Sequence, residues 1–131
     1  GDAAAVASVV AQALQLYSGD FLVGEDNHPD VQRVRSRLRA LLLRRLAAGA
    51  AALQKQGNDE AAAAAAVLRR VVELDPLAEA VVRQWMQCLL RLGRRAEAFE
   101  AYRGCRQQLS VLLQIRPAPE TERLAATLRE A

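Results

Sequence analysis

The sequence holds few of the residues that most often build metal, disulfide or redox sites. It has two cysteines, Cys88 and Cys105, which stand 17 residues apart without a CxxC motif, and one histidine, His28. This supply predicts neither a disulfide framework nor a zinc site. Both cysteines fall on apolar faces of expected helices, so we interpret them as small buried hydrophobic residues of a cytoplasmic protein. We expect no metal and no cofactor.

Catalytic motifs are missing as well. There is no glycine-rich phosphate loop, no HExxH, no GxSxG and no paired-carboxylate motif. His28 precedes Pro29 in a polar loop, and no serine, cysteine or carboxylate stands in a recognisable partnership with it. We interpret His28 as a residue at the start of a helix and predict that the protein is not an enzyme.

Long hydrophobic runs are also absent. Arginine or glutamine interrupts each apolar stretch well before the ~20 residues that a membrane-spanning helix needs, and no basic-then-apolar leader is found. We therefore expect no contact with a membrane. A chain of 131 residues that is 52% hydrophobic fits one compact domain, residues 1–131.

Neither sign of charge dominates. The chain has 18 basic and 15 acidic residues, interspersed, for a net charge of +3, and this balance alone indicates no nucleic-acid face. The densest basic run is RVRSRLRALLLRR, residues 33–45. At about 100° per residue its arginines wrap around a helix, and no aromatic residue is interleaved for base stacking. A solvated surface is favoured, with nucleic-acid binding through this second helix as the alternative hypothesis.

What the sequence does contain is apolar periodicity of 3.6 residues from end to end, without the strict alternation of strands, which predicts an all-α fold of about six helices. The expected helices cover residues 6–17, 29–56, a segment within 57–76, 77–92, 94–114 and a last segment from Pro119. The second is predicted to bury Val31, Val34, Leu38, Leu41, Leu42, Leu46 and Leu53. The fifth is predicted to bury Ala98, Tyr102, Cys105, Leu109, Leu112 and Leu113.

Part of the sequence repeats with a displacement of 34 residues. The repeated pairs are Ala64 and Ala98, Leu68 and Tyr102, Val67 and Ala101, Arg69 and Arg103, and Val71 and Cys105. This is the period of a tetratricopeptide-like helical hairpin, and it predicts a right-handed stack of hairpins with the first and last helices as caps. The turn residues Gly57 and Gly93 are 36 apart, so the first repeat holds two more residues between its turn and its alanine-rich helix.

The hairpin register also predicts a candidate binding groove. In such repeats the first helix of each pair lines a concave surface, and this register places six basic or amide side chains there: Arg44, Gln54, Lys55, Arg83, Gln87 and Arg91. A surface of this kind would grip a carboxylate or an acidic peptide through charge-assisted hydrogen bonds.

Several motifs in order resemble a known family. ALQLYSGDFL (13–22), RLRALLLRRL (37–46), the stretch from ELDPLAEAVV to CRQQL (73–109) and PAPETERL (117–124) are similar to the bacterial transcriptional activator domain of regulators of the Streptomyces antibiotic regulatory protein type. Gln114 stands where glycine is common in that family.

The resemblance implies a tetratricopeptide-like regulatory domain that serves dimerisation, interdomain control or contact with the transcription machinery. Its partner would be a second copy, another domain of the full-length chain, or a separate protein. The family usually places this domain after a winged helix, and the sequence shows no β-hairpin pattern for one, so we do not expect direct DNA binding by this fragment. A regulatory domain of a multidomain signalling ATPase is the remaining alternative.

Overall fold

The computed structural model describes residues 29–129, and every regular element in that range is a helix. The elements are α2 (Pro29–Leu53), the short 3-10 helix η1 (Gln54–Gln56), α3 (Asn58–Leu74), α4 (Glu79–Arg91), α5 (Arg95–Leu113) and α6 (Pro119–Arg129). The predicted all-α class is confirmed, and the five predicted helices in this range are present with ends that shift by a few residues. The helix expected at residues 6–17 lies outside the described residues.

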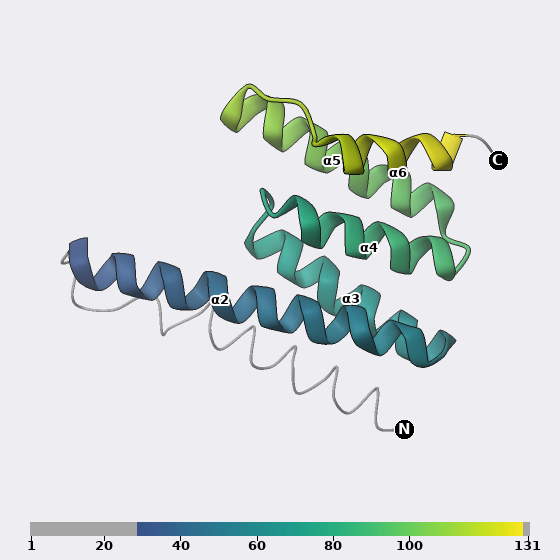
Figure 1. The fold of residues 1–131 in the computed structure, drawn as a ribbon, viewed down its shortest axis with the longest axis horizontal. Coiled ribbons are helices and arrows are strands. Elements are labelled where there is room, and N and C mark those ends of the chain that lie inside the picture. The colour runs from purple at the N-terminus through teal and green to yellow at the C-terminus, as the bar shows by residue number, and fades with distance from the viewer. Residues whose placement is uncertain (1–28, 130–131) are drawn as a thin grey trace.

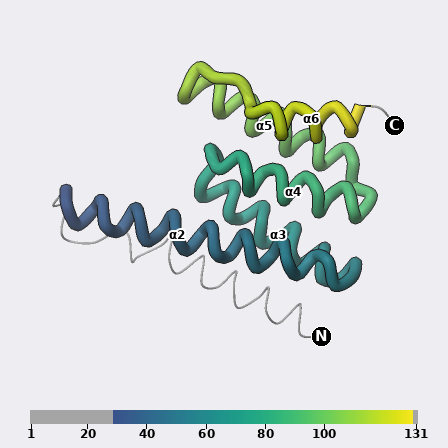
Figure 2. The backbone as a smooth tube through the Cα atoms, viewed as in Figure 1, coloured from purple at the N-terminus to yellow at the C-terminus, as the bar shows by residue number. Residues whose placement is uncertain are grey.

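The helices form a stack in which each lies against its neighbours in the chain (Figure 1). α3 packs against both α2 and α4, and α4 packs against both α3 and α5. α6 closes the far end against α5 and α4, which is the capping position predicted for the last helix. Figure 2 traces the same path and shows the first half of α2 extending past the end of α3. The predicted handedness of the stack stays a prediction.

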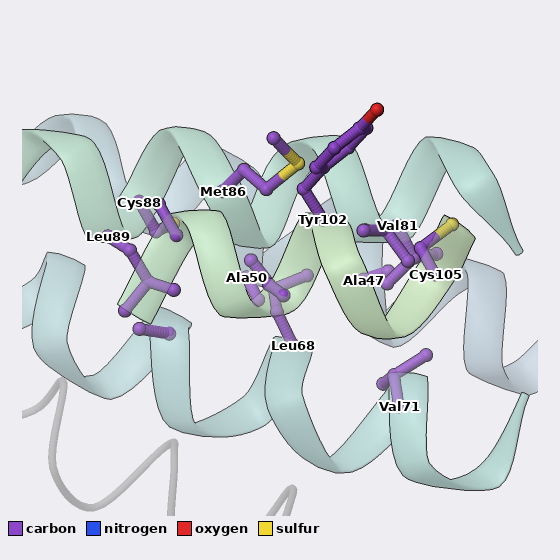
Figure 3. Packing of buried hydrophobic residues seen from close by; sticks show 14 of the residues in the cluster. Ala47, Ala50, Leu68, Val71, Val81, Met86, Cys88, Leu89, Tyr102 and Cys105 are labelled. Carbon is purple, nitrogen blue, oxygen red and sulfur yellow. The ribbon is translucent and has the colours of Figure 1, made fainter. Parts of the chain in front are cut away.

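The core runs along the middle of this stack (Figure 3). Leu68 of α3, Met86 of α4 and Tyr102 of α5 are among its largest fully buried side chains. Four of the five pairs related by the 34-residue displacement are buried, whereas Arg69 and Arg103 are exposed, so most of the repeat identified in the sequence is a repeat of core positions. The alanines of α3 supply short side chains to this core, which lets the backbones of α2 and α4 approach α3 closely.

Two different turns connect the repeats. Gly93 has φ +74°, and the bonds from its N–H to the carbonyl of Leu90 and from Arg94 N–H to the carbonyl of Leu89 form a Schellman motif that ends α4. Gly57 has extended backbone and follows η1. α3 starts six residues before Ala64, whereas α5 starts only three before Ala98, so α3 is longer at this end by three residues, or about one turn. Two of these are the extra residues of the first repeat, and the third arises because α3 starts one residue nearer to its turn glycine.

Two parts of the predicted core are wrong. Val34, Leu38 and Leu41 are 56%, 51% and 49% exposed, because α2 buries the face of Leu43, Ala47 and Ala50 instead and α3 lies only along its second half. Val31, Leu42, Leu46 and Leu53 are partly buried.

On α5 burial stops at Leu109, and Leu112 and Leu113 are 53% and 47% exposed. Apolar periodicity marks which side of a helix is hydrophobic, but it does not reveal how far the neighbouring helix extends along it.

α6 is fixed by polar contacts as well as by the apolar side chains of Ala125 and Leu128. The phenol of Tyr102 on α5 donates a hydrogen bond of 2.8 Å to Oε1 of Glu122, and Arg95 donates to the carbonyl oxygen of Leu128 at 3.2 Å. The guanidinium of Arg129 lies 5.6 Å from the ring centroid of Phe99. These contacts lie on one side of α6 and orient it on α5.

Candidate functional site

One of the six residues predicted to line a basic groove, Arg83, makes a hydrogen bond between two helices of the fold. Arg83 of α4 donates a hydrogen bond of 2.9 Å to the hydroxyl oxygen of Thr121 on α6. That hydroxyl donates in turn to Oε1 of Glu79 at 2.8 Å, and the same carboxylate oxygen accepts the backbone N–H of Ala118 at 2.8 Å. Thr121 is fully buried. The guanidinium of Arg83 is therefore part of the contact that holds α6 on α4.

The other five predicted residues remain at the surface. Arg44, Lys55, Gln87 and Arg91 are exposed and Gln54 is partly exposed. Arg83, Gln87 and Arg91 follow one another at four-residue spacing, so they share one stripe of α4. Within residues 29–129, no hydrogen bond or ion pair joins this stripe to Arg44, Gln54 or Lys55. A basic binding surface across these two elements stays a prediction.

The arginine run of α2 is divided between surface and fold. Arg33 makes an exposed ion pair of 3.8 Å with Asp30, and Arg37 is exposed. Arg39, which is partly buried, instead donates a hydrogen bond of 3.1 Å to the carbonyl oxygen of Leu74 at the C-terminal end of α3. A cation at this position also interacts favourably with the negative end of the helix dipole. At least one arginine of the run, Arg39, therefore helps to hold α2 against α3.

A groove of about 660 Å³ lies between α3 and α5. Its lining residues are Arg69, Val72, Glu73, Pro76, Trp85, Ala96, Glu97, Glu100, Ala101, Gly104, Cys105 and Gln108. It arises because α3 and α5 each pack on α4 and scarcely contact one another. We call it the α3–α5 groove.

The groove has an apolar floor and a charged rim. The partly buried Trp85 of α4 reaches it from between the two walls, with Val72 beside it on α3 and Cys105 on α5. Mostly apolar surface with a few polar groups is typical of a binding site. On the wall formed by α5, the middle positions are small, namely Ala101 and Gly104.

The rim carries three carboxylates and one guanidinium. Nε of Arg69 lies 3.3 Å from Glu73, and Glu100 accepts a hydrogen bond of 3.2 Å from Arg103. Glu97 has no ion-pair or hydrogen-bond partner among residues 29–129 and stands in the first turn of α5, where the helix dipole favours a negative charge. The lining residues therefore give the groove a net negative charge, although the whole chain carries +3.

Both cysteines are buried, as predicted. Burial raises the pKa of the Cys88 thiol to about 11, against a smaller opposing effect of Arg91. Burial likewise raises the pKa of Cys105 to about 11, with Glu79 adding to the shift and Arg83 opposing it. At neutral pH both are thiols, whereas nucleophilic cysteines are thiolates. His28 lies outside the described residues.

Sequence reasoning missed the α3–α5 groove, although two signals point to it. Trp85 is the single tryptophan of the chain, and it is only partly buried although the next residue of α4, Met86, is fully buried. Gly104 interrupts the middle of α5, where glycine is unfavourable relative to alanine. Neither signal alone indicates a hollow, and only the structure shows that both residues line the same groove.

No helix within residues 29–129 combines the length and apolar character needed to cross a bilayer. In the same range, no three His, Cys, Asp or Glu side chains are gathered where they could hold a metal ion.

Comparison with known proteins places the chain in a family. The sequence matches no curated protein and no solved structure. The family model of the bacterial transcriptional activator domain matches residues 1–129. That range includes the whole described helical stack and the four motifs that carry the resemblance. The chain therefore belongs to the bacterial transcriptional activator domain family.

Proposed function

We propose that this domain of a bacterial transcription regulator is a non-catalytic protein-binding module, and that a segment of a partner protein occupies the α3–α5 groove. The observation that carries the proposal is the groove itself, which is lined by Trp85 of α4 and, in the middle of its wall on α5, by the small residues Ala101 and Gly104. The centre of a protein interface is usually a pocket in which an anchor side chain of the partner is buried against aromatic or apolar residues.

The length of the groove favours a chain segment over a compact ligand. Its wall on α5 runs from Ala96 to Gln108, which corresponds to ~18 Å at 1.5 Å per residue. Two helices that flank a shallow apolar channel are the setting in which partner helices bind. The protonated state of Cys88 and Cys105 supports a role without covalent catalysis.

Site-specific photocrosslinking in the full-length regulator, in its own host, tests the proposal with two matched glutamines. A benzophenone amino acid replaces either Gln108, in the α3–α5 groove, or Gln87, on the basic stripe of α4. We expect a protein adduct from position 108, identified by mass spectrometry, that disappears when Gly104→Leu fills the groove. Adducts from position 87 alone would move the partner site to the basic stripe and contradict a groove site.

A second candidate function is nucleic-acid binding through α2. The exposure of Arg37, Arg44 and Arg45 favours it, but no aromatic side chain accompanies them for base stacking. Retention of duplex DNA that falls steeply as salt rises, and that is lost in Arg37→Glu with Arg44→Glu, would support this function.

If the domain belongs to a multidomain ATPase instead, the α3–α5 groove would bind another domain of the same chain.

A further inference from the structure

We infer that the occupant of the α3–α5 groove is an amphipathic helix that presents one large aliphatic side chain flanked by arginine or lysine. This inference rests on the proposed function and names the chemistry of the partner. Three features of the described residues carry it: the charge of the rim, the glycine in the wall and the indole at the floor.

The rim selects for positive charge. Glu73 has two arginine partners and Glu100 has one, at 2.8 to 3.3 Å, but Glu97 has none among residues 29–129. A cation of the partner can therefore pair with Glu97 without displacing an ion pair or hydrogen bond to any of residues 29–129. Charge complementarity at a rim mainly fixes specificity and association rate, and here it opposes an acidic partner.

Gly104 is explained by close approach of a partner backbone. It lies in the interior of α5, is exposed, and does not have positive φ. A Cβ at this position would meet nothing within 4 Å. The fold would thus accept alanine, which is the better helix former. A wall without large side chains at Ala101 and Gly104 lets a second helix pack nearer than bulkier residues would allow.

Trp85 supplies the anchor site. Trp85 is partly buried and lines the groove together with Val72 and Cys105, so part of its side chain remains to be covered. A leucine-sized side chain placed over it would remove apolar surface on both partners from water. The small residues beside it and the carboxylates above it then match an aliphatic anchor with flanking basic residues.

The test uses Trp85 as the reporter, because it is the single tryptophan of the chain. The probe is a synthetic, tryptophan-free 18-residue peptide with leucine on one helical face and arginine at its edges. Two matched peptides replace arginine by glutamate or leucine by serine. We expect the first peptide to shift the emission of Trp85 to shorter wavelength in a saturable manner that weakens with salt, and the other two to leave it unchanged.

Variants of the protein make the test specific. Glu97→Lys should weaken binding of the leucine–arginine peptide roughly tenfold, the change that corresponds to 1.4 kcal/mol. Gly104→Ala should raise the melting temperature and yet weaken binding. Gly49→Ala is its matched control, since Gly49 is also exposed inside a helix, with open space where the added methyl group would stand, but lies outside the groove. It should raise the melting temperature and leave binding unchanged.

The outcomes separate this inference from the proposed function. Equal binding of the glutamate peptide, or unchanged affinity in Gly104→Ala, would overturn a closely packed basic helix while leaving the groove as a protein site. A shift of Trp85 emission with protein concentration alone would identify a second copy as the occupant and overturn the inference. No response of Trp85 to any peptide, together with no crosslink from position 108, would contradict the proposed function itself.

Discussion

Arg83 on α4 donates its hydrogen bond to Thr121 on α6, a residue 38 positions later in the chain, at 2.9 Å. Arg83, which the sequence predicted to bind an acidic partner, thus makes one of the contacts that hold α6 on α4. A charge reversal at Arg83 would remove this contact and place two carboxylates, its own and that of Glu79, near the same hydroxyl. Loss of binding in such a variant would report loss of packing as much as loss of a partner contact.

Thr121→Val tests the contact between α4 and α6. The substitution keeps the shape of the side chain but leaves Arg83 and Glu79 without the hydroxyl that joins them. Because both bonds involve charged groups, we expect the free energy of unfolding to fall by ~1.5 to 3 kcal/mol, measured by urea denaturation. Thr127→Val on the same helix is the control, since its exposed hydroxyl donates a hydrogen bond to the backbone carbonyl of Leu124 and to no other of residues 29–129. Equal effects of the two substitutions would contradict a role for this contact.

Leu68→Ala tests the core position shared by the two repeats. Leu68 is fully buried in the core, so its truncation leaves a cavity, and we expect a loss of ~2 to 5 kcal/mol in the free energy of unfolding. Leu41→Ala removes the same atoms from a side chain that is 49% exposed, and should cost under ~1 kcal/mol. A Leu41 variant as unstable as the Leu68 variant would mean that α2 buries the stripe predicted from the sequence.

Much of the fold could be predicted from local patterns. Helix starts and ends follow from Pro29, Pro76, Gly93 and Pro119, and the buried repeat follows from spacing alone, because both depend on residues close in sequence. The exposure of the ends of the apolar stripes, as at Leu38 and Leu112, could not be predicted in this way, because it depends on where a neighbouring helix ends.

The candidate sites show the same limit more strongly. The four-residue spacing of Arg83, Gln87 and Arg91 puts them on one stripe of α4, but no local pattern reveals that Arg83 donates a hydrogen bond to Thr121. The α3–α5 groove depends on the separation of two helices that scarcely touch. Separation is a property of how α4 fills the space between them, and it cannot be read from the period of any one helix.

The two left-handed residues of the described chain should respond in opposite ways to substitution. Gly93 has φ +74°, and Gly93→Ala would place a Cβ in a conformation that costs ~1 to 2 kcal/mol for other residues. Gln114 already has φ 54° at the end of α5. Gln114→Gly should therefore raise the free energy of unfolding, by up to ~1 kcal/mol, less the hydrogen bond of 3.1 Å that its amide donates to the carbonyl of Val111. Thermal denaturation should show a lower melting temperature for Gly93→Ala and a higher one for Gln114→Gly. Destabilisation by Gln114→Gly would show that the side-chain hydrogen bond outweighs the backbone strain.

Alkaline pH should lower the free energy of unfolding, because two buried thiols and one buried phenol lose their protons there. The pKa values of Cys88 and Cys105 are raised by burial from 9.0 to about 11, and burial together with the bond to Glu122 raises the pKa of Tyr102 above 10.0. For such groups the folded state holds the proton more tightly than the unfolded state, so the stabilisation is complete below pH 9 and is lost as pH rises through about 11. A shift of this size corresponds to ~2 to 3 kcal/mol for each thiol.

The measurement is the free energy of unfolding by urea under reducing conditions at intervals from pH 7 to pH 11. We expect little change up to about pH 9 and a steep fall above it. A Cys88→Ala and Cys105→Ala variant starts from a different stability because small cavities form, but its slope between pH 9 and pH 11 should be shallower, since only Tyr102 then remains of the three groups. Equal slopes for the two proteins would show that the thiols reach water in the folded state, and would contradict their placement in the core.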